Sequence, residues 1–169
     1  MMIVFYLAGA VAIISTVMML TRTNAVHALL YLIVSLLAVA VVFYTLGAPF
    51  VAALEVIIYA GAIMVLFVFV VMLLNLGEQV TQTERAWLHS SGWLGPAVLG
   101  GVLAAELIYV LVRGIRVDYP QAVVDPRQVG ASLFGTYLVG VELASFLLLA
   151  GLVAAYHLGW RKAERSENR

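Results

Sequence analysis

Long apolar stretches, separated by short polar connections, dominate the pattern along the chain. The five stretches are residues 2–20, 26–46, 50–76, 93–112 and 137–158. A helix needs about 20 apolar residues to cross the ~30 Å hydrocarbon core of a bilayer. Strands of a membrane barrel would be about 10 residues long and would alternate in polarity, unlike these stretches. The pattern predicts an all-α fold, namely a polytopic membrane protein with five transmembrane helices in one domain over residues 1–158.

Several residues in the connections are typical of the beginnings and ends of helices. Pro49 stands where a helix can begin, and Gly77 stands where one can end. The connection over residues 113–136 is the longest and contains two prolines, so we expect it to be irregular. The first stretch has no basic residue before it and no small-residue cleavage site after it, so we expect an uncleaved span. Residues 159–169 are predicted to form a solvated tail.

Composition supports insertion into a membrane. Hydrophobic residues make up 64% of the chain and charged residues 11%, whereas soluble domains are about 45–50% apolar and about 25% charged. The absence of cysteine excludes disulfides, iron–sulfur ligation and thiol chemistry. Nine basic and nine acidic residues give no net charge, so no electrostatic field favours nucleic acid as a partner.

The distribution of basic residues predicts the orientation, because cytoplasmic loops are enriched in Lys and Arg. With five spans, one side of the membrane would carry six basic residues: Arg22, Arg85, Arg161, Lys162, Arg165 and Arg169. The opposite side would carry three: Arg113, Arg116 and Arg127. We therefore expect the N-terminus outside the cell and the C-terminal tail in the cytoplasm.

Three acidic residues lie inside the predicted spans, and no basic residue does. They are Glu55, Glu106 and Glu142. A charged side chain at the bilayer centre costs about 2.5–3.5 kcal/mol on insertion scales, so each carboxyl must face protein or water, pair, or carry a proton. In the predicted topology all three lie at a similar depth, about one to two helical turns from the outer surface. The set indicates either hydrogen-bonded packing or a path for protons or ions.

The third stretch has an unusual centre. Tyr59 follows Glu55 by four residues and shares its helix face, so the carboxyl could satisfy a buried hydroxyl. Gly61 lies near midspan between two alanines, where it indicates either close helix packing or a point at which the helix bends or forms a π-bulge. From Val65 onward the run is rich in β-branched and aromatic residues, which lowers helix propensity.

No motif for a resident metal or cofactor is present. His27 and His157 open the second span and close the fifth, which would allow haem ligation in principle. A lone histidine at a helix end is more often a capping or interfacial residue, so we expect no haem. The sequence contains no phosphate-binding loop, dinucleotide fingerprint, zinc spacing or nucleophile motif.

Three segments resemble the family that includes subunit J of bacterial NADH:quinone oxidoreductase and chain 6 of mitochondrial complex I. The most specific is residues 54–76, with the sequence LEVIIYAGAIMVLFVFVVMLLNL. The others are residues 24–31 (NAVHALLY) and one segment of the fifth stretch that comprises residues 141–145 (VELAS) and 148–155 (LLAGLVAA). The likeness extends over nearly the whole chain.

The resemblance implies a core subunit of the proton-pumping membrane arm of respiratory complex I. The implied partners are other membrane-arm subunits and the bilayer, in a hetero-oligomer of the bacterial inner membrane. NADH, FMN, iron–sulfur clusters and quinone would be bound by other subunits, with no cofactor and no catalytic centre in this chain. In the family the third helix carries a π-bulge near residues 59–61, which makes Tyr59, Gly61 and Val65 candidate pivots of a helix that gates a hydrated path. The resemblance implies no functional role for Glu106.

Other functions remain open from the residues alone. One alternative is a subunit of a multisubunit cation/proton antiporter or a small stand-alone transporter. The chain shows no internal repeat and no substrate-binding constellation, which disfavours a stand-alone transporter. Another alternative is a scaffold whose three membrane glutamates are inert.

Overall fold

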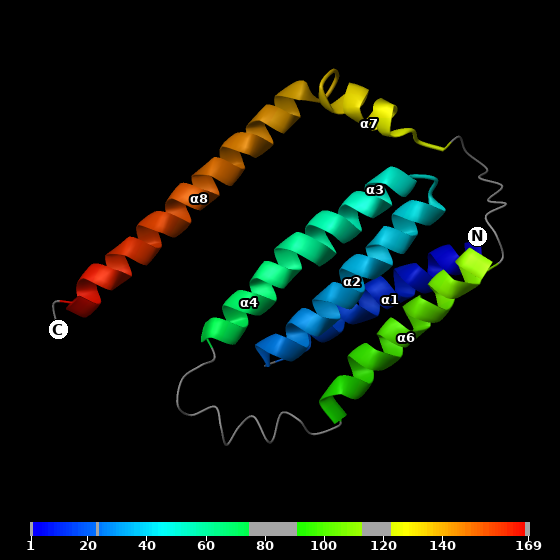
Figure 1. The fold of residues 1–169 in the computed structure, drawn as a ribbon, viewed down its shortest axis with the longest axis horizontal. Coiled ribbons are helices and arrows are strands. Elements are labelled where there is room, and N and C mark those ends of the chain that lie inside the picture. Colours follow the sequence, from blue (N-terminus) through cyan, green and yellow to red (C-terminus); the bar gives the residue numbers. More distant parts are fainter. Residues whose placement is uncertain (1, 23, 75–90, 113–122, 168–169) are drawn as a thin grey trace. The chain divides into compact units, whose positions relative to one another are not determined.

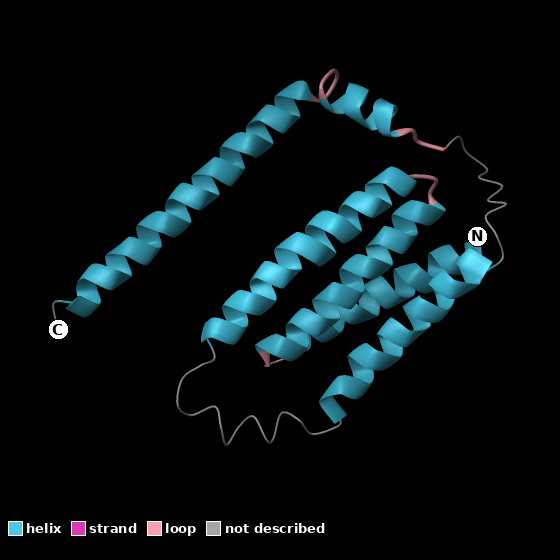
Figure 2. Cartoon of the chain, viewed as in Figure 1, coloured by secondary structure: helices cyan, strands magenta, loops and turns pink. Residues whose placement is uncertain are grey.

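The protein is described by a computed structural model over residues 2–22, 24–74, 91–112 and 123–167. Within these ranges every regular element is a helix (Figures 1 and 2). The elements are α1 (Met2–Thr21), α2 (Ala25–Thr45), α3 (Pro49–Leu54), η1 (Glu55–Ile63), α4 (Met64–Leu74), α6 (Ser91–Val112), α7 (Pro126–Leu133) and α8 (Leu138–Glu167).

Five helices are long and apolar enough to cross a membrane. They span Met2–Thr21, Ala25–Thr45, Pro49–Leu73, Trp93–Val110 and Leu138–Leu158. The third of these joins α3, η1 and α4 into one continuous helix. The predicted all-α fold with five membrane-spanning helices is therefore confirmed.

Local signals set the beginnings of the second and third spans. The Asn24 side chain caps α2 by accepting hydrogen bonds from the backbone N–H groups of Val26 (2.9 Å) and His27 (3.2 Å). Pro49 occupies the first turn of α3, as its position predicted. Between α2 and α3 the chain reverses at Gly47, whose φ of 83° lies in the left-handed region that favours glycine. Gly77, the predicted end of the third span, lies outside the described residues.

One prediction about an irregular segment was wrong for part of its range. Within residues 113–136 the structure has the helix α7, which begins at a capping box: Asp125 accepts from Arg127 N–H (2.7 Å), and the Gln128 side chain accepts from Asp125 N–H (3.2 Å). Asp125, Pro126 and Gln128 form a recognisable start signal, since a proline in the first helical turn favours the beginning of a helix. Helix α8 continues to Glu167, so the described part of the tail is helical, and its solvation stays a prediction.

The chain forms two compact units, Met1–Val124 and Asp125–Arg169. In the first unit α2 is the central helix, because it contacts α1, α3, η1, α4 and α6 (Figure 1). The core of this unit joins Val11 of α1, Val34 and Ala38 of α2, and Leu103 of α6. Small side chains such as Ala38 allow close approach of helix backbones, which drives association in membranes. The second unit consists of α7 and α8, which contact each other.

Two hydroxyl groups, one exposed and one buried, link α1 to α2. The Thr16 Oγ1 atom lies 2.8 Å from the Ser35 Oγ atom. Both hydroxyls also reach the carbonyl oxygen of Ala12, at 2.8 Å from Thr16 and 3.2 Å from Ser35. Interhelical hydrogen bonds of this kind contribute about 0.6 kcal/mol each in a membrane. They fix the register of the two helices as well as adding stability.

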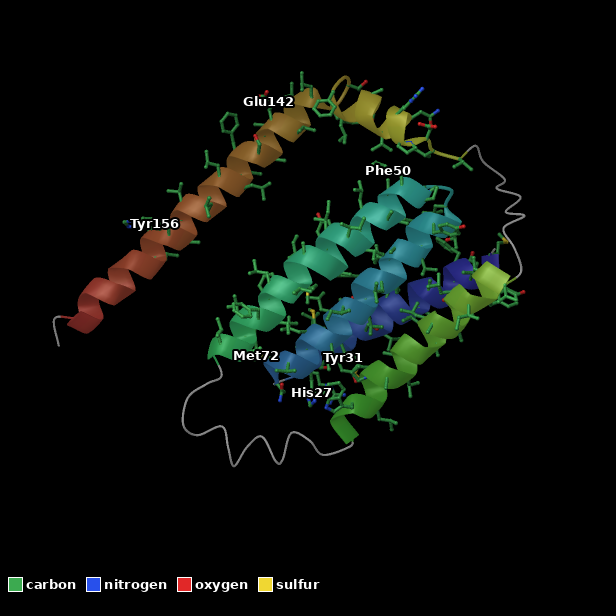
Figure 3. The ribbon with its side chains drawn as sticks, in the orientation of Figure 1. His27, Tyr31, Phe50, Met72, Glu142 and Tyr156 are labelled. Carbon is green, nitrogen blue, oxygen red and sulfur yellow. The ribbon has the colours of Figure 1, made fainter. Side chains whose placement is uncertain are left out.

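Tyr31 connects three helices at one end of the first unit (Figure 3). Its side chain is 2% exposed. The Arg22 guanidinium donates a hydrogen bond to the Tyr31 hydroxyl at 3.4 Å and lies 5.4 Å from the ring centroid. Gly95 of α6 packs directly against the Tyr31 hydroxyl and leaves no space for a Cβ atom. The contact therefore requires glycine at position 95.

We predict that Gly95→Ala destabilises the first unit. The added methyl group would overlap the Tyr31 hydroxyl and push α6 away from α2. Overpacking of this kind costs about 1–3 kcal/mol. The thermal unfolding midpoint of the detergent-purified protein should fall. The matched control is Gly101→Ala on the same helix, where a Cβ meets nothing within 4 Å. Equal midpoints for the two variants would contradict the close approach of Gly95 and Tyr31.

Candidate functional site

The third membrane helix changes its hydrogen-bond register at its centre. η1 is a π-helix of nine residues, Glu55–Ile63, between the α-helical segments α3 and α4. At its end the backbone N–H of Met64 is directed at the carbonyl oxygen of Tyr59, five residues earlier. π-helical segments are rare and usually mark functional positions. The predicted π-bulge near residues 59–61 is present, and the π segment is longer than a single-turn bulge.

Gly61 fits the π conformation for a local backbone reason. A Cβ atom at position 61 would lie 3.1 Å from the carbonyl oxygen of Val56, which is tighter than an ordinary van der Waals contact. Val56 stands five residues before Gly61, the spacing of a π-helical hydrogen bond. Apart from its chain neighbours and the nearby backbone of its own helix, no other atom would lie within 4 Å of this Cβ atom. Packing against another helix of the described chain is therefore not what requires glycine here.

η1 presents its side chains to the outside of the first unit. None of its residues is buried, and five large side chains are exposed: Val56, Ile57, Ile58, Tyr59 and Ile63. The α4 segment continues this apolar surface, except that Met64 is only 2% exposed. The π-helical part of the span is thus free of tight packing within the described chain, while its junction with α4 is anchored.

Glu55 and Tyr59 lie on η1 but do not pair. The Glu55 side chain is half-buried at the start of η1, and the Tyr59 side chain is 50% exposed. Within η1, which the structure describes in full, the two side chains form no hydrogen bond with each other. The expectation that the carboxyl satisfies the hydroxyl therefore finds no support. Both polar groups are available to groups outside the described part of the chain.

Glu106 has a different environment. Its side chain is 7% exposed, and neither carboxyl oxygen has a hydrogen-bond partner. Glu106 follows the core residue Leu103 by three positions on α6, so it lies on the face that packs against α1 and α2. Because α2 lies between η1 and α6 (Figure 1), Glu55 and Glu106 are on different sides of α2.

Glu142 belongs to the second unit. It lies in the second turn of α8 with an exposed side chain, as Figure 3 shows. Ser145 donates a hydrogen bond to the Glu142 carbonyl oxygen at 2.7 Å, so the contact does not involve the carboxyl. The structure therefore does not bring the three membrane glutamates into one cluster within the first unit.

Histidine and acidic residues do not gather into a metal centre in the described ranges, where no group of three or more potential ligands occurs. His27 lies in the first turn of α2, and His157 lies on α8 of the other unit. The hydroxyl cluster of Thr16 and Ser35 was missed in the sequence. Its signal is the placement of small hydroxyl residues within two otherwise apolar spans.

Comparison with known proteins identifies the family. Residues 15–158 match the family described as NADH-ubiquinone/plastoquinone oxidoreductase chain 6. The chain belongs to this family. The matched range includes η1, α6 and all three segments that carried the resemblance, which is thereby confirmed.

Relatives within the chain 6 family are similar along nearly their whole length. NADH-quinone oxidoreductase subunit J of Pseudomonas aeruginosa is 56% identical over 164 residues, covering 95% of this chain and 98% of the relative. The subunit J of Escherichia coli is 52% identical over 155 residues, covering 92% and 84%. That of Buchnera aphidicola subsp. Schizaphis graminum is 45% identical over 161 residues, covering 94% and 98%. Family membership and five apolar helices together make this chain a multi-pass membrane protein.

Proposed function

We propose that this chain is a membrane-arm subunit of a bacterial NADH:quinone oxidoreductase, respiratory complex I. In this role it couples electron transfer from NADH to quinone to proton translocation, by gating a hydrated path through its third helix. Family membership supports the assignment to the complex. The observation that carries the gating role is the nine-residue π-helix in the middle of a membrane-spanning helix.

A π segment can act as a gate because its register can change without breaking the helix. Irregular backbone at membrane depth is tolerated only where it is buried in protein or lines water. Conversion of one π turn to α shifts the hydrogen-bond register by one residue and rotates the following segment by about 100°. Such a rotation would change which side chains, Val65 among them, face the path. Tyr59, Gly61 and Val65 are the proposed pivot.

The proton path itself would use the membrane carboxyls. Glu55 stands at the beginning of η1 and is half-buried, so a change of register there alters its surroundings directly. Tyr59 offers a hydroxyl one turn later. Glu106 and Glu142 are the further candidates, on α6 and α8. These groups can hold and release protons, which is the chemistry that a translocation path needs.

The exposed apolar surface supports a hetero-oligomer. η1 and α4 leave large hydrophobic side chains uncovered along a whole membrane span. Other membrane-arm subunits and lipid would cover this surface. In this arrangement NADH, FMN, iron–sulfur clusters and quinone are bound by other subunits, and this chain contributes no catalytic centre of its own. The complex lies in the inner membrane of a bacterial cell.

The gating role predicts an uncoupling effect for Gly61→Ala. The new methyl group would crowd the Val56 carbonyl in the π form and would favour regular helix, a bias of about 1 kcal/mol or fivefold in population. The ratio of proton pumping to NADH oxidation with an artificial acceptor should fall in membranes, and Gly61→Val should lower it further. Normal content of the complex must be verified first.

The control for this experiment is Gly9→Ala on α1. A Cβ atom there meets nothing within 4 Å, so the pumping ratio should stay normal. If Gly61→Ala and Gly61→Val also kept a normal ratio at normal complex content, the pivot would be excluded.

The proton path predicts a loss of pumping for Glu55→Gln. The amide is close to the acid in shape, so the complex should assemble. Because an amide cannot carry the proton, proton translocation per NADH oxidised should decrease, while oxidation with an artificial acceptor should be unchanged. Glu142→Gln is the parallel variant on α8. Unchanged pumping in Glu55→Gln would reduce Glu55 to a packing residue.

The proposed topology predicts a cytoplasmic C-terminus. The six basic residues on one side of the membrane, including the four after residue 160, favour this orientation. A reporter that is active only in the cytoplasm should be active when fused after Arg169, and a periplasm-dependent reporter should be silent. The opposite result would reverse the topology and the proposed depth of the glutamates.

A further inference from the structure

We propose that α1, α2 and α6 enclose a site that binds a proton and one or more water molecules. The Glu106 carboxyl is the group that holds the proton and hydrogen-bonds to the water. The inference deepens the proposed proton path at one of its candidate residues. It places a protonatable group on the side of α2 away from the π-helix. The gating mechanism does not use this group.

The carboxyl is sealed inside the chain. Glu106 is 7% exposed, and both oxygens are inaccessible from outside and lack a protein partner. A neighbouring subunit therefore cannot reach these oxygens while α6 keeps its packing on α1 and α2. Water molecules inside the bundle are the remaining source of hydrogen bonds, since buried polar groups without protein partners are usually satisfied in this way.

The three helices that enclose Glu106 supply no cation to stabilise its ionised form. The segments Met2–Thr21, Ala25–Thr45 and Ser91–Val112 contain no Lys or Arg, and Glu106 is their only acidic residue. The other titratable groups of these helices are His27 and the tyrosines Tyr6, Tyr31, Tyr44 and Tyr109. Tyr31 and His27 lie toward the opposite end of α2, where Tyr31 meets Gly95. A buried carboxylate without a partner is strongly disfavoured, whereas the protonated acid can donate to water.

Apolar residues of the core lie next to Glu106 on α6. Val11, Val34, Ala38 and Leu103 form the core one turn from Glu106 along α6. The proposed proton site at Glu106 therefore borders on this apolar core.

The experiment uses the assembled complex carrying the wild-type chain, Glu106→Gln, Glu106→Leu or the matched control Ser15→Ala. Ser15 is also fully buried with an unpartnered side-chain oxygen, but its hydroxyl does not titrate in the physiological range. Infrared spectra are recorded in H2O and D2O at neutral pH. High-resolution cryo-EM maps are examined for ordered water within hydrogen-bond distance of residue 106.

The expected difference spectrum, wild type minus Glu106→Gln, contains the C=O stretch of a protonated carboxylic acid that shifts in D2O. The Ser15→Ala difference spectrum contains no such band. The wild-type map shows ordered water at the Glu106 oxygens, which persists in Glu106→Gln and is lost in Glu106→Leu. An ionised carboxylate band, or a wild-type map without water at these oxygens, would overturn the proposal. Neither readout depends on electron transfer or pumping. The proposal of a proton site can therefore be refuted while the gating role stands, and the gating role can be refuted while the proton site stands.

Discussion

The hydrogen bonds of the backbone are the constraint on which this structure depends. Inside hydrocarbon each N–H and C=O group must find a partner within the protein, so a membrane span has few options other than a continuous helix. The π-helix Glu55–Ile63 meets this requirement while changing the number of residues in each turn. It thus introduces a rotational choice into a membrane helix without leaving the backbone unsatisfied. Glycine suits this segment, because a Cβ atom at position 61 would lie 3.1 Å from the Val56 carbonyl oxygen.

The five spans and the site of irregularity could be predicted from the sequence because each has a local cause. A span is encoded by the length of an apolar run, the start of α3 by Pro49, and the weak point of the third helix by a midspan glycine. The extent of η1 could not be predicted, since α and π registers share the same residues and differ only in which carbonyl each N–H reaches. The fit of Gly95 against Tyr31 was equally hidden, because it joins residues 64 positions apart on two helices.

The surroundings of the three membrane glutamates could not be predicted from the sequence. All three occupy apolar stretches and lie at a similar predicted depth, yet their surroundings differ. Glu55 is half-buried on the π-helix, Glu106 is sealed between three helices, and Glu142 is exposed on α8 of the second unit. What a carboxyl can do follows from its access to water and to partners, and that access is set by helix packing. An exposed carboxyl can serve an interface with another chain, whereas a sealed one must be satisfied from within.

The two sides of α2 are suited to different tasks. On one side, the Thr16–Ser35 contact and the Tyr31–Gly95 packing hold α1, α2 and α6 in a fixed register. On the other side, η1 has no buried residue, so a change of its register meets little resistance from this chain. The packing contacts that oppose such a change are those of Met64, the first residue of α4, whose side chain is 2% exposed. Rotation of α4 would remove Met64 from its packing contacts and bring another side chain into its place. In the proposed gating mechanism, the fit of that replacement would set the balance between the two registers, because a bistable helix needs a small difference in free energy between two packed states.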